Sequence, residues 1–281
     1  MKKIIPLFAI SITAATGCIS FSGSDCKCDS DCACTKPCAC DAEPNTLSKA
    51  EQEAGWKLLW DGKTLNGWVG VKNNCKAPPS KGWVIKDGIL RVLPSCRINE
   101  QGKWEKLPPK QAALGGGGDI CTEKEYKDFE FKIDFRLTKS ANSGIKYFYN
   151  KQKNKGTTLE YQLLDENHPD ADKGKNGNRR IASLYDLIPA NAQKIVKPTG
   201  EWNTAKIVSV GNRVEHWLNG VKVVEYKRKS TDFRLAVNAS KYAKWGTEEG
   251  GHWGELETGR ILIQDHTDST VDFRNIKIRE L

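Results

Sequence analysis

The sequence predicts an antiparallel β-sandwich over residues 56–281, and three observations lead to this fold class. Several segments alternate apolar and polar residues with a period of two, as strands do when one face is buried. Asn219-Gly220 separates two such segments and favours a tight hairpin. Helical periodicity is almost absent in this part of the chain, and many short strands separated by Gly and Asn turns are typical of sandwiches.

The expected strands follow one another through the whole of residues 56–281. The longest alternating set begins at Phe129 and ends at Leu137, so one face of that strand is expected to be buried. His216, Trp202 and Trp217 are expected to pack in the core. The alternating sets are Phe129, Phe131, Ile133, Phe135 and Leu137; Leu159, Tyr161 and Leu163; Val214, His216 and Leu218; Val221 and Val223; Ile261 and Ile263; and Val271, Phe273, Ile276 and Ile278.

Three segments between the strands, 94–118, 150–157 and 167–180, are expected to be loops. Loops on a rigid sandwich commonly carry binding residues. The run Gly115 to Gly118 is not followed by the Lys-Ser/Thr pair or the helix of a phosphate-binding loop. These four glycines are therefore expected to form a flexible loop.

The first 17 residues have the features of a signal peptide. Lys2 and Lys3 precede a short apolar stretch that is too short to span a membrane. Ala15-Thr16-Gly17 directly before Cys18 resembles a bacterial lipobox, so Cys18 is expected to carry lipid and to anchor the protein to a membrane. The expected location is the bacterial cell envelope, at the outer membrane or the periplasmic face. Ordinary cleavage near the same place, with Cys18 unmodified, is the alternative.

Residues 18–55 are expected to be a flexible tether. Three lysines, seven acidic residues and almost no large apolar side chains leave this segment unable to build a core. A thiolate cluster for a soft metal is one further interpretation of its repeated Cys-x-Cys pattern, and disulfides or plain spacer sequence in an oxidising compartment are another. The cysteines of the pattern are Cys26, Cys28, Cys32, Cys34, Cys38 and Cys40.

Composition excludes several classes of protein. The net charge is +9, but the lysines are scattered and no nucleic-acid-binding motif is present, so nucleic acid is not expected as a partner. Apart from the leader no long apolar stretch occurs, which excludes a multispan membrane protein. Cys75, Cys96 and Cys121 are an odd set in the folded part, and the sequence does not identify which pair, if any, is bridged.

Short blocks with recognisable motifs run along residues 56–281. They are LLWDGKTLNGW at 58–68, GWVIKDGIL at 82–90, DFEF at 128–131, NSGI at 142–145, EYQLLD at 160–165, EWN at 201–203, HWLNG at 216–220, GRILIQDH at 259–266 and VDFRNI at 271–276. In this order the blocks resemble the 3-keto-disaccharide hydrolase domain family. Two positions depart from its pattern, because Thr267 and Ala182 stand where Gly is more usual.

The resemblance implies an all-β, concanavalin-A-like jelly-roll β-sandwich of two antiparallel sheets. It also implies a bacterial, often lipid-anchored protein that acts on an oligosaccharide or glycoside oxidised to a ketone at carbon 3. Such a ketone makes the hydrogen on carbon 2 acidic, and the enolate formed by its removal expels the group on carbon 1. The site then needs a base, an acid and a stabiliser for the enolate oxygen. A divalent metal ion as cofactor is one source of that stabiliser.

Three residues are the candidate catalytic groups. His266 is expected to be the base or a metal ligand, because imidazole titrates near neutral pH. Glu160 shares one strand face with Gln162, a pair that suits a sugar-binding cleft, and Glu160 is the second candidate metal ligand. Asp165 follows the same strand and is expected to complete the cluster. The structural alternatives are a histidine bonded to a loop carbonyl and a solvent-exposed polar face.

The remaining candidates are expected to bind substrate. Gln264 lies on the same strand face as His266 by the period of two. Arg274 is expected to clamp a hydroxyl or the enolate oxygen, with an ion pair to Asp272 or Asp265 as the alternative. Asn142, Tyr185 and Trp245 complete the set, as a hydroxyl contact and two stacking platforms, or alternatively as a turn former and two core or rim residues.

Two further function classes remain open at this level. A non-catalytic carbohydrate-binding lipoprotein could use the same sandwich, since fold does not fix function. A metal-handling surface protein acting through the cysteines of residues 18–55 is the third hypothesis. Loss of turnover with retained sugar binding in His266→Ala would favour the enzyme over the binding module.

Overall fold

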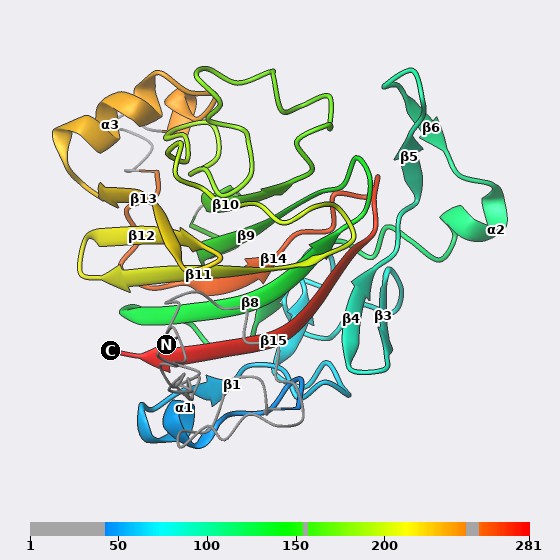
Figure 1. Ribbon diagram of the computed structural model, residues 1–281, viewed down its shortest axis with the longest axis horizontal. Helices are drawn as coiled ribbons and strands as arrows, with labels where there is room; N and C mark the ends of the chain where they lie inside the picture. Colours follow the sequence, from blue (N-terminus) through cyan, green and yellow to red (C-terminus); the bar gives the residue numbers. More distant parts are fainter. Residues whose placement is uncertain (1–42, 154–156, 246–252) are drawn as a thin grey trace, which may run out of the picture. The chain divides into compact units, whose positions relative to one another are not determined.

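The computed structural model describes residues 43–153, 157–245 and 253–281. Two antiparallel sheets pack face to face, and a separate two-stranded hairpin projects beside them (Figure 1). This confirms the predicted class, a concanavalin-A-like jelly-roll β-sandwich. The predicted signal peptide, Cys18 and the cysteines of 26–40 lie outside the described residues. Within the described residues, no helix has the length and apolar character needed to cross a membrane.

The larger sheet has eight strands, and its hydrogen-bonded order connects residues far apart in the sequence. β15, the last strand of the chain, lies between β8 and β4 and also pairs with β1. The order is β13 (Val221–Lys227), β12 (Arg213–Leu218), β11 (Trp202–Val210), β8 (Phe129–Leu137), β15 (Val271–Glu280), β4 (Ile89–Val92) and β3 (Trp83–Lys86), with β1 (Lys57–Leu58) beside β15.

The smaller sheet has five strands. Its order is β10 (Leu159–Leu164), β9 (Asn142–Tyr149), β14 (Arg260–Ile263), β7 (Ile120–Thr122) and β2 (Trp68–Gly70). The short helical elements lie outside both sheets and are α1 (Lys49–Glu53), α2 (Pro109–Ala112), α3 (Thr231–Asn238) and the 3₁₀ turn η2 (Ala243–Trp245).

The core lies between the two sheets and follows the predicted alternation. The inward side chains of β8, from Phe129 to Leu137, are at most 5% exposed. Leu159, Tyr161 and Leu163 of β10 face them from the smaller sheet and are fully buried. Because the period is two, the intervening residues of β10 point to the opposite, outer face of the smaller sheet.

The segment 94–118 is more ordered than the sequence predicts. It contains a hairpin of β5 (Cys96–Ile98) and β6 (Trp104–Lys106), followed by α2. The expectation of a flexible glycine loop is also wrong. A Cβ atom at Gly115 would lie 2.3 Å from the Pro94 carbonyl oxygen, and one at Gly117 would lie 2.0 Å from that of Lys81. These glycines allow close backbone packing.

Residues 43–55 belong to the folded domain, which corrects the predicted boundary at residue 56. The backbone N–H of Asn45 donates to Oδ1 of Asn275, and the Asn45 side-chain amide accepts from the Asn275 backbone N–H and donates to the Gly88 carbonyl. Glu51 of α1 accepts a hydrogen bond from Lys277 of β15 at 2.7 Å. The sequence did not indicate this, because the segment contributes polar contacts rather than an apolar stripe.

Trp202 and Trp217 are not core residues, so that prediction is wrong. Both rings are half-buried on the outer face of the larger sheet. The guanidinium groups of Arg136 and Arg274 lie 4.6 and 4.2 Å from the Trp202 ring, and the Lys206 ammonium lies 4.2 Å from the Trp217 ring. A flat ring under a cation can cover a sheet face without entering the core.

The three cysteines of the folded domain are free thiols. Cys75 and Cys121 have their sulfur atoms 3.6 Å apart in a small apolar cluster on the outer face of the smaller sheet. Burial, together with Cys75, raises the pKa of Cys121 to about 12. Cys96 lies elsewhere, with its Sγ donating to the Thr267 carbonyl. Proximity therefore favours Cys75 and Cys121 as the pair that an oxidising compartment would join.

His216 of β12 is buried in the core, as predicted. Its Nδ1 lies 3.0 Å from the Ala182 carbonyl oxygen and its Nε2 lies 2.9 Å from the Tyr147 hydroxyl. A carbonyl only accepts, so Nδ1 carries the proton and Nε2 accepts from Tyr147. The Tyr147 hydroxyl also lies 2.6 Å from that of Tyr226. Burial lowers the pKa of His216 to about 4, against the effect of its backbone hydrogen bond.

Acidification should therefore destabilise the protein through His216. Between its ordinary value of 6.5 and about 4, the unfolded chain binds a proton that the folded chain excludes. The contribution is complete above pH 6.5 and is lost as the pH falls towards 4, by about 3 kcal/mol. His216→Gln should flatten this part of the profile, as measured by chemical denaturation across pH. Parallel profiles for the two proteins would contradict the prediction.

Candidate functional site

A cavity of about 380 Å³ lies on the outer face of the smaller sheet. Alternate side chains of β9 and β10 form its floor, because the residues between the core positions of these strands point outward, and Gln264 and His266 join them from the segment that follows β14. Most of the residues predicted from the sequence meet here. Those that line the cavity are Asn142, Glu160, Gln162, Tyr185, Trp245, Gln264 and His266.

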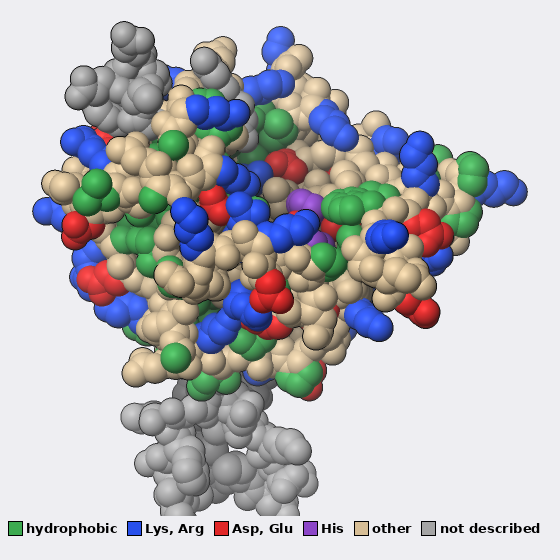
Figure 2. Space-filling model, turned by 90° about the horizontal axis from the view of Figure 1, so that it is seen from above, with side chains coloured by type: hydrophobic (Ala, Val, Ile, Leu, Met, Phe, Trp, Pro, Cys, Tyr) green, Lys and Arg blue, Asp and Glu red, His purple; other side chains and the backbone are tan. Residues whose placement is uncertain are grey.

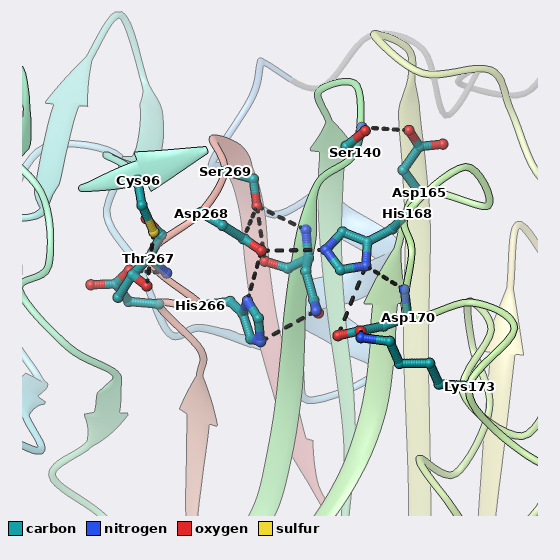
Figure 3. Close-up of polar contacts among 12 residues, drawn as sticks. Cys96, Ser140, Asp165, His168, Asp170, Lys173, His266, Thr267, Asp268 and Ser269 are labelled. Atoms are coloured by element: carbon teal, nitrogen blue, oxygen red, sulfur yellow. Dashed lines mark hydrogen bonds and ion pairs between the residues drawn. The ribbon is translucent and has the colours of Figure 1, made fainter. Parts of the chain in front are cut away.

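His266 is held by a buried carboxylate that the sequence analysis missed. Its Nδ1 lies 3.1 Å from Oδ2 of Asp268, whose side chain is fully buried (Figure 3). Asp268 also lies 3.3 Å from Nε2 of His168 and accepts from the Ser269 hydroxyl at 2.8 Å. His168 Nδ1 accepts from the Asp170 backbone N–H, so His168 carries its proton on Nε2 and donates it to Asp268.

The contacts of His266 favour one tautomer. Nδ1 faces the Asp268 carboxylate at ion-pair distance without a well-aligned hydrogen bond, and with the proton on Nδ1 the Nε2 atom keeps its lone pair. Nε2 lies 3.3 Å from the Asn142 amide nitrogen, and the Asn142 amide oxygen accepts from Gln162 at 3.1 Å. The chain of amides therefore presents an N–H to Nε2 and supports its role as an acceptor. Such an imidazole is arranged to take a proton from a substrate.

Electrostatics strengthens the basicity of His266. Burial opposes the charged imidazole, but Asp268 outweighs it, and the pKa of His266 is raised above its ordinary value. Burial likewise opposes the Asp268 anion, but the hydrogen bonds from His168 and His266 lower the pKa of Asp268 to about 2. Asp268 is therefore charged throughout the physiological range and stabilises a protonated His266.

Glu160 and Lys146 form the second polar pair of the cavity. They are cross-strand partners in β10 and β9. Burial raises the pKa of Glu160, although Lys146 opposes the shift. Burial alone would lower the pKa of Lys146, but the charges of Glu160 and Asp119 raise it overall. Lys146 Nζ lies 3.6 Å from Asp119. The pair thus holds protons more tightly than isolated groups would, and sequence alternation alone identified only Glu160.

A glycine makes room for the Glu160 carboxylate. Gly144 pairs with Gln162 across β9 and β10, and a Cβ atom there would lie 2.0 Å from Oε1 of Glu160. The glycine of the NSGI block at 142–145 is therefore needed for steric reasons. Any larger residue at 144 would displace the carboxylate.

Tyr185, Trp245 and two lysines form the rim. The Lys241 ammonium lies 4.2 Å from the Tyr185 ring, and the Lys244 ammonium lies 4.1 Å from the Trp245 ring. The Arg179 guanidinium also lies near the Tyr185 ring, at 5.5 Å. Figure 2 shows histidine side chains in a hollow of this face, with Lys and Arg side chains around it. The rim is therefore both aromatic and positively charged.

Two predicted residues lie outside the cavity. Asp165 accepts hydrogen bonds from the Ser140 backbone N–H at 2.6 Å and from the Thr199 hydroxyl at 3.4 Å, so it holds loops at the end of β10. Arg274 lies on the outer face of the other sheet, over Trp202, with its Nε 3.5 Å from Asp134. The structure therefore joins neither side chain to Glu160 and His266.

The described residues do not present the ligand set of a metal centre. Within residues 43–153, 157–245 and 253–281, no three or more His, Cys, Asp or Glu side chains are grouped so as to hold an ion. Glu160 and His266 are two candidate donors, and their neighbours in the cavity floor are the amides Asn142, Gln162 and Gln264 and the amine Lys146. The divalent metal cofactor therefore stays a prediction.

Comparison with known proteins identifies relatives over nearly the whole domain. Residues 55–279 match the family described as the 3-keto-alpha-glucoside-1,2-lyase-like domain. A protein of Bacteroides thetaiotaomicron named 3-keto-disaccharide hydrolase is 37% identical over 258 residues, which cover 85% of this chain and 83% of that protein.

Two solved structures from Parabacteroides distasonis, each titled as a suspected glycosyl hydrolase, share the fold. One has a TM-score of 0.66 at 29% identity and covers 85% of this chain and 100% of that one. The other has a TM-score of 0.53 at 26% identity and covers 80% of this chain and 99% of that one.

Gly144→Ala should disable the site by displacing one carboxylate. The added methyl group would force Glu160 out of its position, and a shift of about 1 Å in a side chain of an active site can lower turnover by about a hundredfold. Turnover of a glycoside substrate measures the effect. Gly70→Ala in β2 of the same sheet is the matched control, because its Cβ would lie no closer than 3.3 Å to a neighbouring atom. Wild-type turnover in Gly144→Ala would show that the Glu160 position is unimportant.

Proposed function

The chain belongs to the 3-keto-alpha-glucoside-1,2-lyase-like domain family, and from this premise we propose that it cleaves the glycosidic bond of 3-keto-glycosides. The proposed reaction removes the proton on carbon 2 and eliminates the group on carbon 1. The observation that carries the proposal is the Asp268–His266 pair. The Nε2 lone pair of His266 faces the cavity that Glu160 also lines.

His266 is the proposed base. Its Nε2 takes the proton from carbon 2, and the resulting imidazolium is stabilised by Asp268 through Nδ1–H. The electron pair of the broken C–H bond forms the enolate, whose oxygen is the former ketone oxygen on carbon 3. Lys146, charged and mostly buried, supports the proposal as the group that stabilises this oxygen.

Glu160 is the proposed acid. Its raised pKa favours a protonated carboxyl, which donates to the glycosidic oxygen as the bond to carbon 1 breaks. The products of this step are an alcohol and a sugar unsaturated between carbons 1 and 2. Water then adds: the Glu160 carboxylate takes a proton from water, the hydroxide bonds to carbon 1, and the His266 imidazolium returns its proton to carbon 2, which completes a net hydrolysis and restores both groups. Gln162 and Gln264 are proposed to orient the sugar hydroxyls.

The acid limb of the pH–rate profile should report His266. The base must be neutral, so kcat/KM should rise with pH through an apparent pKa above 6.5, the ordinary value of an imidazole. Asp268→Asn should lower that apparent pKa and reduce kcat by about a hundredfold or more, since an amide N–H favours the wrong tautomer. An unchanged profile would remove Asp268 from the mechanism.

His266→Ala separates the enzyme from a carbohydrate-binding module on the same fold. With the soluble fragment from residue 43 onward, release of the leaving sugar should vanish while binding of the 3-keto-disaccharide survives. Binding without release in the wild-type protein would favour the binding module. In the same assay, release that a chelator abolishes and a divalent metal restores would establish the metal cofactor.

The anchor at Cys18 is proposed on the lipobox-like sequence before it. Lipid on this cysteine would place the domain at the envelope face, reached by glycosides from outside. Cys18→Ser should move the full-length protein from the membrane fraction to the soluble fraction and leave turnover unchanged. A variant that stays in the membrane fraction would contradict lipidation at this residue.

A further inference from the structure

An exposed tryptophan lies beside the catalytic histidine but outside the cavity. Trp104 of β6 is 53% exposed, and its ring centroid lies 5.7 Å from that of His266, with the ring planes tilted by 40°. It is not part of the cavity lining. Tryptophan usually buries its large apolar surface, so an exposed ring beside His266 indicates a surface that a ligand can cover.

The hairpin that carries Trp104 is fixed to the catalytic loop. At its base, the backbone N–H groups of Ser95 and Cys96 donate to the Thr267 carbonyl at 2.8 and 3.0 Å, and the Cys96 thiol donates to the same oxygen. Thr267 directly follows His266. The position of the tryptophan ring is therefore tied to the position of the base.

The tip of the hairpin is also stiff and lies near a second loop of the site. Asn99 accepts from the backbone N–H groups of Gln101 and Lys103 through its side chain, which closes the turn. A Cβ atom at Gly102 would lie 3.6 Å from Cγ of Pro169, the residue after His168. The hairpin thus reaches from the His266 loop to the His168 loop, and Trp104 lies on it as a pre-organised surface.

We propose that Trp104 is the stacking platform of a second sugar subsite, which holds the ring that leaves when the glycosidic bond breaks. This proposal rests on the proposed function. The ring that reacts must lie in the cavity, where His266 and Glu160 reach carbons 1 and 2. The group on carbon 1 then extends out of the cavity, and the flat apolar face of Trp104 lies on the His266 side of that exit. Pyranose rings present faces of C–H groups that suit such a surface.

The proposed subsite predicts that Trp104 matters only for substrates with a second sugar ring. A 3-keto-disaccharide has a second ring that can contact Trp104, whereas a 3-keto methyl glycoside has none. Trp104→Ala should raise KM for the disaccharide by about tenfold and change kcat/KM for the methyl glycoside by less than about twofold. Trp104→Phe, which keeps an aromatic face, should recover most of the loss. Leu114→Ala is the control, since Leu114 is 60% exposed in the same 94–118 segment.

Two outcomes would overturn the platform. Equal losses on both substrates, with a shifted acid limb in the pH–rate profile, would show that Trp104 only positions His266. No loss on either substrate would show that the ring is not used.

A wild-type protein that cleaves neither substrate would refute the proposed function instead. In that case calorimetric binding decides the platform separately, because Trp104→Ala should still weaken disaccharide binding by about tenfold and leave binding of the methyl glycoside unchanged. Equal binding of the disaccharide by both proteins would refute the subsite.

Discussion

The buried carboxylate of Asp268 is the constraint on which the site depends. A fully buried anion is costly unless polar partners satisfy it. Asp268 has two partners in its own loop, His266 and Ser269, and a third, His168, from a distant part of the chain. Meeting this requirement brings the loop after β10 against the loop between β14 and β15. The same contact selects the tautomer of His266. Folding therefore imposes the geometry that the proposed base, His266, would need.

Period-two alternation predicted the fold and part of the cavity floor, because it reports which face of a strand a residue occupies. Glu160 and Gln162 were found in this way, since their neighbours in β10 are core residues. The same rule does not report to which sheet a strand belongs. Arg274 was therefore expected at the site, although β15 lies in the larger sheet and its register shifts between Arg274 and Lys277.

Other site residues carry no pattern that one sequence could reveal. Asp268 and His168 are single polar residues in loops 100 positions apart, and only the folded chain joins them. Lys146 is an outward residue of β9 whose partner, Glu160, is set by the register of two strands. Trp104 was assigned to a loop because β5 and β6 are only three residues each. Pairing between segments, not local propensity, decided these positions: it joins distant loops for Asp268 and His168, and it forms a short local hairpin for Trp104.

The two departures from the family pattern have a common backbone cause. Thr267 and Ala182 have φ angles of +69° and +64°, in the left-handed region where Gly is favoured. A β-branched threonine is strained there, so surrounding contacts must hold it. The Thr267 carbonyl accepts the three donors at the base of the hairpin, and its N–H donates to Asp265. The strain is thus offset by the bonds that join the base of the β5–β6 hairpin to Thr267. A glycine at 267 would adopt the same backbone more easily, but its greater conformational freedom would hold that backbone less firmly. Threonine at this position therefore fits a structure in which the hairpin that carries Trp104 and the loop that carries His266 keep a fixed relation.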